Sequence, residues 1–73
     1  MSAMAHKLLE CINKEYHNRI DKNFSGDPSV FEDKLFVEKY GYNGKTLENL
    51  LDELSKNNFI ERWVIGAFTL IID

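Results

Sequence analysis

The sequence predicts one α+β domain, mainly α, with three helices followed by a short C-terminal β-hairpin. Apolar residues recur every three or four positions through most of the chain, which is the spacing of one buried helix face. After Asn58 the period changes, because apolar residues follow one another almost without interruption, as they do in strands. At 73 residues the chain has room for one core, so we expect a single domain over residues 1–73.

The first helix is expected over residues 3–22. Its buried stripe is predicted from residues four positions apart and their neighbours, namely Leu8, Ile12, Tyr16 and Ile20 with Leu9 and Cys11. Phe24 is expected to pack under the end of this helix. Residues 1–5 are expected to be disordered or to derive from cloning.

The strongest turn signal is Ser-Gly-Asp-Pro at residues 25–28. Pro28 suits the first position of a helix and Asp27 its N-cap, so a second helix is expected over residues 28–40. A tight turn with two glycines and an asparagine follows at residues 41–44. Such a turn can join two helices at a steep angle.

The third helix has the clearest pattern in the chain. Thr46 is expected as its N-cap, and Asn57 and Asn58 are expected to end it because asparagine tolerates the left-handed conformation. Its apolar stripe consists of Leu47, Leu50, Leu51 and Leu54. Beyond it, Gly66 suits the first central position of a two-residue type II′ turn with Ala67, which predicts a very short hairpin.

Residues 45–62 resemble the second half of a winged helix-turn-helix domain, whose third helix commonly reads TvsrLLkkLeekglIer before a two-stranded wing. The matching positions here are Thr46, Leu50, Leu51, Leu54, Phe59, Ile60, Glu61 and Arg62. The resemblance extends over roughly residues 30–72 and implies a three-helix, winged-helix-like domain. It also offers an alternative for the second helix, in which a lead-in precedes a helix over residues 32–40. The residues alone leave both versions open.

The resemblance implies a small regulator that binds duplex DNA. The third helix would approach the bases with Asn43, Lys45, Thr46 and Asn49, and Lys56 and Arg62 would hold the DNA backbone. Against this stand the formal net charge of −3 and three carboxylates on the same helix, Glu48, Asp52 and Glu53. The alternative is a protein–protein interaction module, an adaptor or an inhibitor of a DNA-binding protein, that does not bind DNA.

The C-terminal hairpin carries more apolar residues than one layer of three helices can cover. Phe68, Leu70 and Ile72 share one face, and Thr69 and Ile71 share the other. The excess predicts a homodimer or a contact with another protein. The expected contact residues are Trp63, Ile65, Phe68, Leu70 and Ile71.

No catalytic, cofactor or metal site is expected. His6 and His17 are 11 positions apart, which places them ~16 Å apart along a helix, too far to share one ion. Cys11 is the only cysteine, so no internal disulfide can form, which fits a cytoplasmic protein. No apolar run approaches the ~20 residues that span a bilayer, and no residue pattern specifies a small-molecule ligand.

Overall fold

The computed structural model describes residues 1–64 and 66–72, without the side chain of residue 64, and contains three helices and a three-stranded antiparallel sheet. The α+β, mainly α class and the C-terminal hairpin are therefore confirmed. In chain order the elements are α1 (Ala3–Asp21), β1 (Val30–Glu32), α2 (Asp33–Tyr40), α3 (Gly44–Lys56), β2 (Ile60–Val64) and β3 (Ala67–Leu70).

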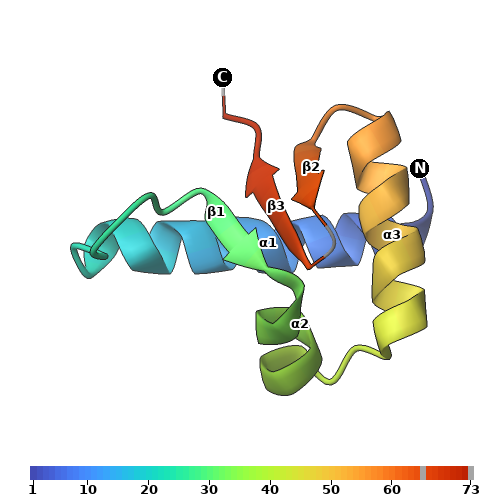
Figure 1. Cartoon of the computed structure of the whole chain (residues 1–73), viewed down its shortest axis with the longest axis horizontal. Helices are drawn as coiled ribbons and strands as arrows, with labels where there is room; N and C mark the ends of the chain where they lie inside the picture. The colour runs from blue at the N-terminus through green and yellow to red at the C-terminus, as the bar shows by residue number, and fades with distance from the viewer. Residues whose placement is uncertain (65, 73) are drawn as a thin grey trace.

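The sheet has the order β1-β3-β2, so the hairpin strand β3 lies in its centre. Phe31 pairs with Phe68, and Ile60 pairs with Leu70; all four side chains are buried on the face that the helices cover. Figure 1 shows α1 passing behind the sheet, with α2 and α3 beside it. The third strand, β1, was not predicted.

The expected helix over residues 28–40 is wrong in its first turn, and the alternative start near residue 32 is confirmed. Asp27 does not cap a helix; its Oδ1 atom accepts hydrogen bonds from the backbone N–H and the hydroxyl of Ser29. After this local turn the backbone continues in an extended conformation instead of a helix. The β-branched Val30 and the aromatic Phe31 then favour a strand that can pair with β3.

The first helix is confirmed within one residue, but its details differ from the prediction. Residues 3–5 belong to α1, where Ser2 is the N-cap and Ala5 is fully buried. Ile20 and Phe24 are exposed instead of packed inside. Glu15 is buried on the helix face where only apolar residues were expected.

The third helix begins two residues earlier than Thr46, because Asn43 caps it. The Asn43 Oδ1 atom accepts hydrogen bonds from the backbone N–H groups of Lys45 and Thr46 at 3.0 and 3.3 Å. At the other end Asn58 has φ = 64°, which confirms the expected left-handed asparagine.

The turn of the hairpin is one position out of phase with the prediction. Val64 pairs with Ala67, and Ala67 already belongs to β3 instead of the turn. Gly66 has φ = 97° and directly precedes β3, so it is not followed by a second turn residue as predicted. A positive φ at this position still explains why a glycine stands there.

The core lies where α1, α2, α3 and the inner face of the sheet meet. It consists of Ala5, Leu8, Ile12, Phe31, Phe36, Leu47, Leu50, Leu51, Leu54, Ile60, Phe68 and Leu70. Phe36 is at its centre, with ring centroids 5.9 Å from Phe31 and 5.8 Å from Phe68. The whole leucine stripe of α3 is in this cluster, as its spacing predicts.

Candidate nucleic-acid interface

The N-terminal half of α3 presents polar side chains that can meet a nucleic acid. Lys45 and Asn49 are exposed one turn apart, and Thr46 is half-buried beside them. Within residues 1–64 and 66–72 no ion pair holds Lys45. Three of the predicted contact residues therefore lie together. Asn43 lies at the start of the same helix, where its side-chain oxygen caps α3, so its side-chain NH2 group is the part left for a nucleic acid.

Carboxylates are interspersed with these groups. Glu48 and Asp52 are exposed on the same helix, and Asp52 forms an exposed ion pair with Lys56 at 3.3 Å. The predicted phosphate contact of Lys56 is thus partly neutralised. Glu53 faces α1, where the backbone N–H of Ser2 donates to it and holds the pKa of that carboxyl below its ordinary value.

Arg62, the second predicted phosphate contact, is held inside the molecule. Its Nη1 atom lies 3.2 Å from Oδ1 of Asp33 and its Nη2 atom lies 3.2 Å from Oδ2, so the ion pair is bidentate. Both side chains are about four-fifths buried, and the pair ties β2 to the first turn of α2. We therefore assign Arg62 to the fold, which corrects its expected place in the interface.

Arg19 is also a structural cation. Its guanidinium carbon lies 4.3 Å from the ring centroid of Phe24 and 4.2 Å from that of Phe31. Its Nη1 atom donates to the carbonyl oxygen of Val30 at 2.6 Å. That carbonyl faces away from β3, since the neighbouring Ser29 oxygen accepts from β3 instead. Arg19 therefore covers the free edge of β1.

A buried polar cluster that was not predicted joins α1 to α2. The Glu15 Oε2 atom accepts from Nζ of Lys39 at 2.7 Å and from the hydroxyl of Tyr40 at 2.6 Å. Burial raises the pKa of Glu15, but these hydrogen bonds and the charges of Lys39 and Arg19 outweigh it, so the pKa lies below its ordinary value. The signal in the sequence was the position of Glu15, three residues after Ile12 on the apolar stripe.

Of the five predicted partner contacts, two are buried, two are exposed and one is not described. Phe68 and Leu70 are buried in the chain's own core, so they cannot contact a partner, which corrects the prediction. Trp63 and Ile71 are 58 % and 45 % exposed. Ile65 lies outside the described residues.

Two further exposed apolar side chains, Phe59 and Ile72, lie near Trp63 and Ile71 in the chain and were not predicted as contacts. The backbone N–H of Ile71 donates to the carbonyl oxygen of Phe59, so these two residues are neighbours in space. We use the name outer patch for Phe59, Trp63, Ile71 and Ile72.

Within the described residues, no group of three or more histidine, cysteine, aspartate or glutamate side chains is placed to hold a metal ion. None of the helices described here has the length and the apolar content that crossing a membrane requires. No family model matches the chain, and no curated protein or solved structure matches it significantly.

Proposed function

We propose that this chain is a small cytoplasmic protein of winged-helix-like architecture that binds duplex DNA through the N-terminal half of α3. The observation that supports the proposal is the cluster of Lys45, Thr46 and Asn49 at the capped start of α3, on the side that faces away from the core. Lysine, threonine and asparagine are side chains that reach base edges and phosphates. The positive end of the helix dipole adds a further attraction for phosphate.

The charges predict weak binding by one copy of the chain. Arg62 and Lys56 are paired with carboxylates, and Glu48 repels phosphate from the same face as Lys45. About one or two phosphate contacts per copy then give a slope of log affinity against log salt of about −1 to −2. Two copies on one duplex would double this slope.

The proposal predicts opposite effects of two substitutions on the same helix. Lys45→Gln removes a phosphate contact and is expected to weaken binding and to make the salt slope shallower by about one. Glu48→Gln removes a repulsive carboxylate and is expected to tighten binding about two- to five-fold at low salt. Fluorescence anisotropy with a mixed-sequence duplex at about 50 mM and about 200 mM salt measures both.

Lys22→Gln is the matched control, since Lys22 is an exposed lysine at the far end of α1. It changes the net charge as Lys45→Gln does, so it separates a local contact from an effect of total charge. An equal loss of DNA affinity in the two lysine variants would rule out α3 as a DNA-binding surface. So would the absence of DNA binding by the unmodified chain at low salt.

A second function, contact with another protein, is favoured by the outer patch. These four apolar side chains are exposed, Phe59 and Ile71 are neighbours in space, and the simplest partner is a second copy of the chain. This contact is compatible with DNA binding, because a dimer would present two α3 helices. A partner other than a second copy would make the chain an interaction module without DNA binding.

The outer patch predicts a concentration-dependent homodimer. Trp63 is the only tryptophan, so its burial in the contact is expected to shift fluorescence emission to shorter wavelength as the concentration rises. Light scattering should show a mass rising above 8.5 kDa over the same range. Trp63→Ser is expected to abolish both changes, whereas Ile20→Ser, at an exposed apolar residue on α1, should leave them intact. A mass that stays at one chain at all concentrations would refute the homodimer.

A further inference from the structure

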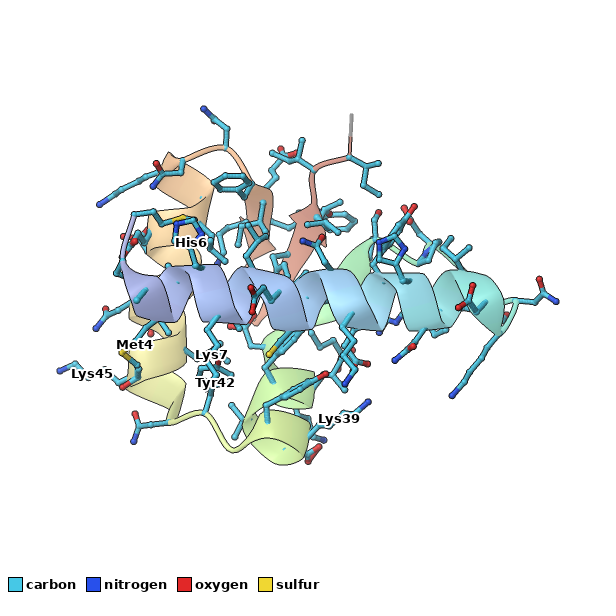
Figure 2. All side chains as sticks on the ribbon, turned by 180° about the vertical axis from the view of Figure 1, so that it is seen from behind. Met4, His6, Lys7, Lys39, Tyr42 and Lys45 are labelled. Carbon is cyan, nitrogen blue, oxygen red and sulfur yellow. The ribbon has the colours of Figure 1, made fainter. Side chains whose placement is uncertain are left out.

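A hollow of about 380 Å³ lies between the N-terminal half of α1 and the turn that joins α2 to α3. Its size falls within the range of small-molecule sites, about 300 to 1,000 Å³. Figure 2 shows Lys7 reaching from α1 toward Tyr42 of the turn, with Met4 nearby. The lining residues are Met4, Lys7, Cys11, Tyr40, Gly41 and Tyr42.

Among the described residues of this wall, the Tyr40 hydroxyl already has a partner. The Tyr40 hydroxyl donates to Glu15, whose charge is compensated by Lys39. Burial raises the pKa of Tyr42, and the neighbouring thiol of Cys11 raises it further, so the Tyr42 phenol stays neutral. The remaining wall offers aromatic faces and the thioether of Met4.

Among the described residues that line the hollow, Lys7 is the one with a charged side chain. Its side chain forms no ion pair with any residue that the structure describes. The hollow therefore combines one available positive charge with an apolar, aromatic wall. A ligand that matches both the charge and the aromatic wall carries one negative charge on a planar, apolar ring system.

We propose that this hollow binds small aromatic carboxylates, with the carboxylate against the Lys7 ammonium and the ring against Tyr42 and Met4. Because the chain as a whole has a net charge of −3, the attraction for the carboxylate is the local one of Lys7. This binding does not depend on the DNA interface, and its test requires no DNA.

Cys11 lines the hollow and is the only cysteine, so its alkylation reports occupancy at a single position. The probe is 1-naphthylacetate, and its matched control is the uncharged 1-naphthylacetamide. We expect the acid to slow the alkylation of Cys11 by iodoacetamide in a saturable manner, with a Kd of about 1 mM. The amide is expected to bind about five-fold or more weakly, because it lacks the charge that pairs with Lys7.

Lys7→Gln is expected to remove the difference between acid and amide, whereas Lys22→Gln, at the opposite end of α1, should preserve it. Titrations followed by amide chemical shifts provide a second readout at Lys7, Gly41 and Tyr42, independent of thiol reactivity. Equal protection by acid and amide, or the absence of saturable shifts at these three amides, would overturn the proposal.

Discussion

Replacing Phe36 with alanine is expected to lower the free energy of unfolding by about 3 to 5 kcal/mol. The Phe36 side chain is fully buried, and its ring contacts Phe31, Phe68 and Tyr40. Alanine would leave a cavity where α2 packs against the sheet. A domain of this size has a total stability of only about 4 to 11 kcal/mol, so this loss is a large fraction of the total.

Urea denaturation followed by circular dichroism measures this loss. Val37→Ala is the matched control, because Val37 is the next residue of the same helix and is 39 % exposed. The control is expected to lose less than about 1 kcal/mol. A similarly small loss for Phe36→Ala would mean that α2 does not pack on the sheet as described.

Replacing Glu15 with alanine is expected to lower the free energy of unfolding by about 1.5 to 3 kcal/mol. The change removes the acceptor of two charge-assisted hydrogen bonds that join α1 to α2. The hydroxyl of Tyr40 would then be left without a partner in a partly buried position. Lys39 is about half exposed and can return to water, which keeps the loss below that of a fully buried ion pair.

The effect of Glu15 should depend on pH in a defined direction. Its folded pKa is depressed, so its charge stabilises the fold above the ordinary pKa of a glutamate, and this stabilisation disappears as the pH falls through the folded pKa. Glu15→Gln keeps an acceptor for Tyr40 but lacks the charge. Urea denaturation at several pH values should therefore show the two proteins converging in stability under acid conditions. A difference that stays constant with pH would show that the Glu15 charge contributes nothing.

The helices were predictable because their signal is local. The leucines of α3 recur at helical spacing, and all four are buried in the core. The end of α3 at Asn57 and Asn58 and the short hairpin also follow from nearby residues. The N-cap was misplaced because Thr46 and Asn43 are both good caps, and only the position of the preceding turn selects between them.

The candidate site was predictable only in part. Lys45, Thr46 and Asn49 are neighbours on one helix, so their proximity follows from the helical period alone. The loss of Arg62 from the interface could not be foreseen in the same way. Its partner Asp33 is 29 residues away in the chain, and the two meet only because β2 packs beside the start of α2.

By itself, the sequence determined the first and third helices, the apolar face of α3 and the short C-terminal hairpin, since hydrophobic periodicity and turn residues act over a few positions. The tertiary structure decided the strand β1, the burial of Glu15 and the partners of Arg19 and Arg62. Each of these depends on a contact between segments distant in the chain. Residues 30–32 form a strand because β3 offers an edge for pairing, and a buried charge persists because another element supplies its partner.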